Sequence, residues 1–173
     1  ASCTVETLAE HYAAVAAEIP TMVVTNYFLP RGAAFGLRVL ETLRDRVEGV
    51  VAVKDDVCGE FARKMSLRVH DRWAVVSGGQ KQNHFDLLPY GCDGYLSTFI
   101  TFKPSVAHAY WRAVTARDWA VAREVIARTD MPFFDYLMTL RGGFDAGMHG
   151  AMELVGITAR WRRPPYASMT DAE

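Results

Sequence analysis

The sequence predicts an α/β fold, in which four parallel strands make half of a (β/α)8 barrel and a helical extension follows. Two observations indicate it: strand-like and helix-like hydrophobic patterns alternate over residues 1–103, and the pattern is purely helical from residue 104 onward. Alternation of this kind produces parallel strands with helices packed on the sheet. A closed eight-stranded barrel needs roughly 200 residues or more. This chain of 173 residues therefore holds only half of one.

An open flavodoxin-like sheet is the competing architecture for the front of the chain. The long helical tail disfavours it, because such a domain usually ends soon after its last strand. We expect one domain, with the half-barrel over residues 1–103 and the last barrel helix and helical extension over residues 104–173. The sequence starts at Ala1 without an initiator methionine, so we expect it to be incomplete at its amino terminus.

The spacing of apolar residues predicts each element in order. Residues 7–18 form an amphipathic helix that Pro20 ends. Four apolar runs predict strands at residues 21–25, 50–54, 73–77 and 94–98. Helical periodicity between the runs predicts helices at residues 37–47, 61–69 and 81–90. After Pro104, a residue favoured at helix starts, helices are predicted at residues 104–116, 118–129, 132–140 and 144–155.

Composition excludes several classes of protein. The net charge of −1 is well mixed along the chain, so nothing indicates nucleic-acid binding. No apolar run is long enough to cross a bilayer, and we expect no membrane partner. The three cysteines Cys3, Cys58 and Cys92 are an odd number at no metal-ligand spacing, which predicts reduced thiols, a cytoplasmic location and no bound metal.

Lys54 follows directly on the apolar run Val50–Val53, so a core strand ends in an amine. Burying a lysine is costly unless the site lowers its pKa or supplies a partner. Imine-forming enzymes hold their nucleophilic lysine beside a pocket in this way. The alternative interpretation is that the strand stops at Lys54 and the ammonium reaches water.

Other polar residues follow the predicted strands, at the edge where parallel α/β folds gather their reactive groups. They are Thr25-Asn26-Tyr27, Asp55, Ser77-Gly78-Gly79-Gln80 and Ser97-Thr98. A nucleophilic lysine among hydroxyl donors suits imine formation with a 2-oxo acid. Ser77-Gly78-Gly79 could also cradle a phosphate, but such a turn is more often a plain βα connection. Asp55 and Asp56 could resemble a phospho-acceptor or magnesium site, but such residues are more often solvated loop acids.

Several segments also match, in order, the motifs of one enzyme family. The Tyr-Asn-x-Pro turn after strand five of that family is similar to Tyr27-Phe28-Leu29-Pro30, and its strand-six signature is similar to Val51-Ala52-Val53-Lys54-Asp55. Its Ser-Gly-Asp turn is similar to Ser77-Gly78-Gly79. Its strand-eight motif Gly-x-x-Gly-x-x-Ser is similar to Gly91-Cys92-Asp93-Gly94-Tyr95-Leu96-Ser97. Arg117-Asp118-Trp119 and Arg163-Pro164-Pro165 are similar to segments nearer the family's carboxyl terminus. The chain therefore resembles the dihydrodipicolinate synthase/N-acetylneuraminate lyase family of class I aldolases.

This resemblance implies strands five to eight of a (β/α)8 TIM barrel plus a three-helix carboxyl-terminal extension. It implies that Lys54 attacks the ketone of pyruvate or another 2-oxo acid as a covalent imine, with no further cofactor. The strand-five tyrosine would relay protons. Matching the proline turn selects Tyr27 for that role, whereas counting from Pro20 selects Thr25, and strand alternation places both on the same face.

The resemblance also implies substrate-binding residues. Gly78, Leu96 and Ser97 would line the pocket, partly through backbone groups. Arg31 lies one position away from the arginine that binds the second substrate's carboxylate in the synthase branch. Gly79-Gln80 replaces acidic residues that many members carry, which argues against a sialic-acid-type pocket.

The leading hypothesis is a Schiff-base lyase, either an aldolase or a dehydratase. We expect a 2-oxo acid and an aldehyde as its small-molecule partners and a homo-oligomer as its assembly. The alternative is a non-catalytic fragment or divergent paralogue that keeps the scaffold and binds a 2-oxo acid weakly or not at all. A half-barrel exposes apolar strand edges, so pairing with a second half is also expected.

Overall fold

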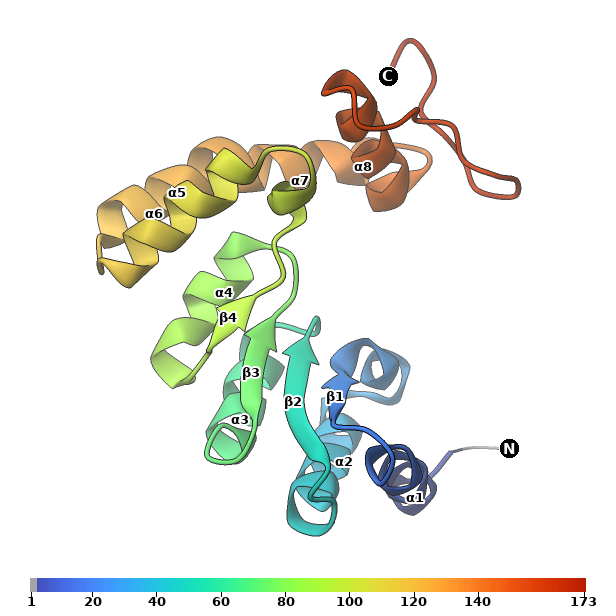
Figure 1. Ribbon diagram of the computed structural model, residues 1–173, viewed down its shortest axis with the longest axis vertical. Coiled ribbons are helices and arrows are strands. Elements are labelled where there is room, and N and C mark those ends of the chain that lie inside the picture. Colours follow the sequence, from blue (N-terminus) through green and yellow to red (C-terminus); the bar gives the residue numbers. More distant parts are fainter. Residues whose placement is uncertain (1–2) are drawn as a thin grey trace. The chain divides into compact units, whose positions relative to one another are not determined.

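The computed structural model describes residues 3–173 and shows an α/β protein (Figure 1). The chain forms two compact units that divide between Leu96 and Ser97. The first unit holds one sheet of parallel strands in the order β1-β2-β3-β4. Its strands are β1 (Thr21–Val24), β2 (Val50–Asp55), β3 (Ala74–Ser77) and β4 (Gly94–Tyr95). The predicted parallel sheet is confirmed.

Helices alternate with these strands as the sequence predicts. They are α1 (Val5–Ala16), α2 (Ala33–Arg46), α3 (Gly59–Val69) and α4 (Lys81–Leu87), with short 3₁₀ turns η1 (Thr25–Arg31) and η2 (Leu88–Tyr90). The side chains of Thr4 and Thr7 each accept a hydrogen bond from the other's backbone N–H and so cap α1. Basic residues in the last turn of α2 complement its dipole.

Two predicted strands end earlier than expected. The strand predicted at residues 94–98 stops at Tyr95, because β3 ends at Ser77 and offers no further register partner. The strand predicted at residues 21–25 stops at Val24, and Thr25 begins the turn η1. The prediction that alternation places Thr25 and Tyr27 on one face of a strand is therefore wrong. The chain leaves the extended conformation at Thr25, whose hydroxyl bonds to the neighbouring strand end.

One face of the sheet packs on helices. Val23, Val53 and Val75 are fully buried and belong to one hydrophobic core, together with apolar residues of α2 and α3. In Figure 1 these two helices lie behind the strands. Because side chains alternate along a strand, the residues directly before and after each of these valines point to the opposite face.

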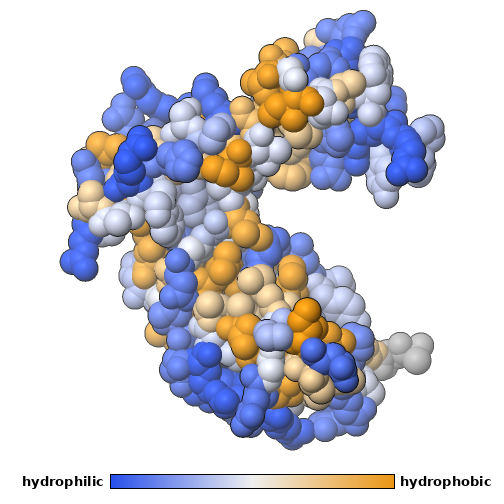
Figure 2. Space-filling view, viewed as in Figure 1, coloured by the Kyte–Doolittle hydropathy of each residue, from blue (hydrophilic) through white to orange (hydrophobic). Residues whose placement is uncertain are grey.

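That opposite face is open and apolar. Met22 and Val24 on this face are 44% and 39% exposed, and Figure 2 shows apolar surface over this part of the first unit. Thr21 pairs with Val50 and Met22 with Ala52, so Val51 forms an irregularity without a register partner. Parallel sheets normally bury both faces. This open sheet face is therefore a surface that a complete parallel fold would cover.

The second unit is helical after the turn η3 (Thr98–Thr101), as predicted. Its helices are α5 (Pro104–Thr115), α6 (Trp119–Val125), α7 (Met131–Thr139) and α8 (Gly143–Leu154), with a π-helical segment η4 (Ile126–Asp130) between α6 and α7. The helices predicted at residues 118–129 and 132–140 thus run on through η4 without a break. Pro132 lacks an N–H and would clash with a carbonyl four residues earlier, and a π turn relieves that clash.

A separate hydrophobic core holds the second unit together, with Phe99, Val106, Phe134 and Leu137 among its buried members. Within residues 3–173, no helix combines the length and the apolarity that crossing a membrane requires.

The first core gives a stability prediction. Met65 on α3 is fully buried, so Met65→Ala leaves a cavity and should lower the free energy of unfolding by about 2–5 kcal/mol. Leu67→Ala on the same helix is the matched control, because Leu67 is 70% exposed and its loss should change stability little. Urea denaturation of both variants tests this, and equal losses would contradict the assignment of the core.

Candidate active site

Lys54 lies near the carboxyl end of β2, on the open sheet face. It is in register with Val24 of β1 and Val76 of β3, so the three side chains share that face. Its Nζ forms an ion pair with Asp56 Oδ2 at 2.5 Å, and the two side chains are 23% and 19% exposed. The amine is therefore neither sealed in the core nor free in water.

Asp56 is the residue that sequence reasoning missed. Its carboxylate lies against the backbone of Gly78 at the end of β3, where a Cβ would come within 1.9 Å of Asp56 Oδ1. Gly78 thus leaves the space that the carboxylate fills. The doublet of acids after Lys54, together with the small residue at the next strand end, was the signal in the sequence.

Asp55 is buried rather than solvated, so the expectation of a solvated loop acid is wrong for it. Its Oδ1 accepts hydrogen bonds from Thr25 Oγ1 at 2.9 Å and Val57 N at 3.2 Å, and its Oδ2 accepts from Cys58 N at 2.9 Å. Burial raises the pKa of Asp55, and these three bonds oppose the rise. The carboxylate thereby fixes the loop that follows β2.

Thr25 and Tyr27, the two predicted proton relays, have different surroundings. Thr25 is fully buried, and its Oγ1 donates to Asp55 and accepts from Asp56 N at 2.9 Å. Tyr27 is 53% exposed on η1, and its electrostatic interaction with Tyr12 of α1 adds to the rise that burial causes in the pKa of Tyr12. Among residues 3–173, the hydrogen bond that Lys54 makes is to Asp56 and to neither of these two.

The predicted substrate-binding residues have different surroundings. Arg31 donates to the carbonyl of Cys3 at 2.5 Å, and its guanidinium lies 4.0 Å from the centre of the Phe35 ring. Leu96 is half exposed, and its backbone N–H donates to Ser77 O at 3.0 Å. Ser97 begins the second unit, and within residues 3–173 its buried Oγ has no hydrogen-bond partner. Of these residues, Gly78 lies beside the Lys54–Asp56 pair, because the Asp56 carboxylate packs against its backbone.

Cys58 follows the two acids but is not an activated nucleophile. Burial, reinforced by the charges of Asp55, Asp56 and Asp86, raises the pKa of its thiol from 9.0 to about 12. A thiol needs its thiolate form to attack or to bind a metal. Over the described part of the chain, no three metal-ligating side chains come together.

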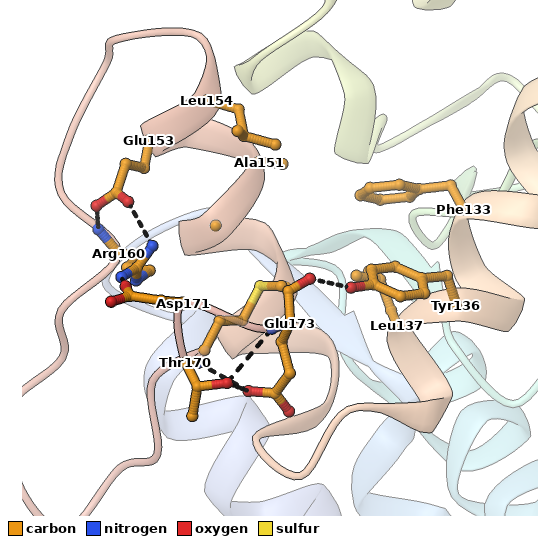
Figure 3. Close-up of a pocket in the computed structure, with 13 residues that line it drawn as sticks. Phe133, Tyr136, Leu137, Ala151, Glu153, Leu154, Arg160, Thr170, Asp171 and Glu173 are labelled. Atoms are coloured by element: carbon orange, nitrogen blue, oxygen red, sulfur yellow. Dashed lines mark hydrogen bonds and ion pairs between the residues drawn. The ribbon is translucent and has the colours of Figure 1, made fainter.

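The second unit contains a cavity of about 450 Å³ of its own (Figure 3). Phe133, Leu137 and Leu154 supply apolar walls, and none of the predicted site residues lines it. Arg160 at its edge is bound by the carboxylates of Glu153 and Asp171. The pair with Glu153 ties the chain after α8 to that helix, as Figure 3 shows, and the pair with Asp171 joins two stretches of that chain.

Comparison with protein families decides the relationship of the chain. The model of the Dihydrodipicolinate synthetase family matches residues 2–173. The chain belongs to this family. The resemblance of the sequence motifs is thereby confirmed.

Curated relatives within the family carry the name of a dehydratase. The chain is 26% identical over 138 residues to a protein of Allorhizobium ampelinum named "Probable 5-dehydro-4-deoxyglucarate dehydratase", a match that covers 78% of this chain and 46% of that protein. A protein of the same name from Ralstonia nicotianae is 28% identical and is covered to 44%. The chain therefore spans about half the length of these relatives.

Solved structures of the family share the fold. YagE, a prophage protein of the dihydrodipicolinic acid synthase family from E. coli K12 in complex with pyruvate, matches 99% of this chain and 59% of its own with a TM-score of 0.78 and 20% identity. Dihydrodipicolinate synthase from Oceanobacillus iheyensis matches 99% of this chain and 57% of its own with a TM-score of 0.79 and 16% identity.

The raised pKa of Cys58 predicts a protected thiol. At about pH 8.5 the native thiol should react with iodoacetamide at least about a hundredfold more slowly than in the urea-unfolded chain, because thiolate is the reactive form. The native rate should still be rising with pH where the unfolded rate has levelled off, since the native pKa is the higher one. Peptide mass mapping separates Cys58 from Cys3 and Cys92. Equal rates in the two states would contradict the assignment.

Proposed function

We propose that this chain carries the imine-forming lysine of a lyase that acts on pyruvate or another 2-oxo acid. The observation that supports it is the Lys54–Asp56 pair, an amine and a carboxylate in contact at the carboxyl edge of a parallel sheet. Family membership and the dehydratase names of the relatives favour a lyase reaction. A related structure holds pyruvate, a 2-oxo acid.

The chain would supply the carboxyl-terminal half of a (β/α)8 barrel, with β1 to β4 as barrel strands five to eight. Its matches cover 57% and 59% of the related chains, so those chains contain further residues that could complete the ring. The open sheet face is the surface that such strands would cover. Lys54 on that face would then point into the interior of the barrel, where the active sites of such barrels gather at the carboxyl ends of the strands.

In the proposed reaction, the neutral amine of Lys54 attacks the ketone carbon and water leaves. The iminium is an electron sink for carbanion chemistry at the neighbouring carbon. Backbone groups near Gly78 and Leu96, the hydroxyl of Ser97, and Arg31 remain proposed contacts for the substrate carboxylate and second substrate. A homo-oligomer remains the proposed assembly, and an aldehyde the proposed second reactant.

The second candidate is a non-catalytic scaffold, which one observation favours. Neither Tyr27 nor Thr25 forms a hydrogen bond with Lys54, so the proton relay that the resemblance implies does not contact the amine. A chain of this kind would keep the fold and bind a 2-oxo acid weakly or not at all.

Trapping of the imine separates these functions. With pyruvate and borohydride, the wild-type chain should gain the mass of one reduced pyruvate adduct, and peptide mapping should place it on Lys54. Lys54→Ala should lose the adduct and keep its circular dichroism spectrum. Lys64→Ala is the matched control, because Lys64 is a surface lysine of α3 paired with Glu60. Folded wild-type protein that forms no adduct would exclude the enzyme function for this chain.

A further inference from the structure

The proposed imine chemistry needs a group that removes and returns protons at the amine. Such a group must lie within hydrogen-bond reach of the reacting atoms. Thr25 Oγ1 has a single proton, which it already donates to Asp55, and it also accepts from Asp56 N. Tyr27 is half exposed, and the hydrogen bond of the Lys54 amine goes to Asp56 instead. The two residues that the resemblance offers are therefore not in place for this task.

The side chain that does reach the amine is Asp56. Its Oδ2 is 2.5 Å from Lys54 Nζ, and both side chains are about four-fifths buried. A carboxylate can accept a proton through either oxygen and return it. Partial burial strengthens its interaction with a neighbouring charge relative to the same pair in bulk water.

The ends of two neighbouring strands hold Asp56 at this point. The hydroxyl of Thr25, after β1, accepts the hydrogen bond of Asp56 N. Gly78, after β3, leaves the space for Oδ1, because a Cβ there would come within 1.9 Å of it. The N–H of Gly78 also donates to the carbonyl of Asp55 at 2.7 Å, which ties β3 to the same loop. A surface ion pair formed by chance would not have its backbone and its carboxylate fixed from two neighbouring strands.

We propose that Asp56 is a catalytic residue, the proton relay that serves Lys54 during imine formation. This role rests on the proposed function, since it has meaning only if Lys54 condenses with a 2-oxo acid. It also gives Thr25 and Gly78 a task as positioning residues, because each fixes part of Asp56.

The chemical step starts when the Lys54 ammonium passes a proton to the Asp56 carboxylate. The freed electron pair forms a C–N bond to the ketone carbon, the C=O π electrons move to oxygen, and the Asp56 carboxyl protonates that oxygen. The carboxylate then takes a proton from the carbinolamine nitrogen and delivers it to the hydroxyl, which leaves as water while the nitrogen pair forms the C=N bond. One ammonium and one ketone give one iminium and one water, with no change in charge.

The experiment measures how fast pyruvate becomes trapped on Lys54. The chain is incubated with pyruvate and cyanoborohydride, and intact mass is followed over time. Asp56→Asn keeps the shape of the side chain and removes its basicity, so the trapping rate should fall by about a hundredfold or more. Asp71→Asn is the matched control, because it also removes one carboxylate from an ion pair, the surface pair with Arg44, and should leave the rate unchanged.

Two further variants separate a relay from a structural role. Gly78→Ala keeps Asp56 in the sequence but pushes its carboxylate aside, and it should slow trapping as well. Asp56→Ala leaves space for a small carboxylic acid. Formate should restore its rate by about tenfold or more, whereas chloride at the same ionic strength should not, because only formate carries protons. Circular dichroism and thermal melts establish that each variant is folded.

The outcomes are distinguishable. A folded wild-type chain that traps no pyruvate rejects the imine function, and the relay with it. Wild-type trapping on Lys54 together with an undiminished rate in Asp56→Asn rejects the relay alone. A slow Asp56→Asn variant and formate rescue of Asp56→Ala support it, and loss of rate that formate and chloride restore equally overturns it.

Discussion

The buried hydrogen bond from Thr25 Oγ1 to Asp55 Oδ1 is the interaction on which the candidate site depends. A carboxylate in the interior is costly unless donors surround it. Asp55 receives three such bonds, one from the end of β1 and two from its own loop. They fix the conformation of the loop after β2, and through that loop they fix the backbone of Asp56. The Lys54–Asp56 contact is thus a consequence of a structural bond one residue away.

The open sheet face gives this pair its second constraint. Met22 and Val24 present apolar surface on the same face as the amine, and exposed apolar area is unfavourable in water. Any element that covers the face removes water from Lys54 and Asp56 at the same time. Their mutual attraction rises as the local dielectric constant falls, while the desolvation of each charge costs free energy. The same covering event would therefore complete the parallel sheet and alter the energetics of proton transfer within the pair.

The sequence was sufficient for whatever depends on local pattern. The alternation of strands and helices follows from hydrophobic periodicity, and the place of Lys54 follows from the apolar run before it. The ends of β1 and β4 and the place of Asp56 depend instead on contacts between residues far apart in the chain, which a local pattern does not reveal. Thr25 leaves the strand because of Asp55, thirty positions further along, and β4 is short because β3 ends at Ser77. The sequence predicts a solvated Asp56, because the space at Gly78 forms only where β2 and β3 lie side by side.

Thr25 and Asp56 are best understood together. A phenol is neutral near pH 7, whereas a carboxylate is charged and attracts the ammonium it must deprotonate. In the proposed mechanism, an acid that takes the place of a tyrosine relay would make the resting contact of the amine an ion pair. A threonine at the end of β1 is compatible with that change, because its small hydroxyl fits under the Asp55–Asp56 loop and bonds to both residues. A side chain larger than that of Thr25 would fill the volume that this buried network occupies. The position of Asp56 therefore depends on a small hydroxyl residue at Thr25.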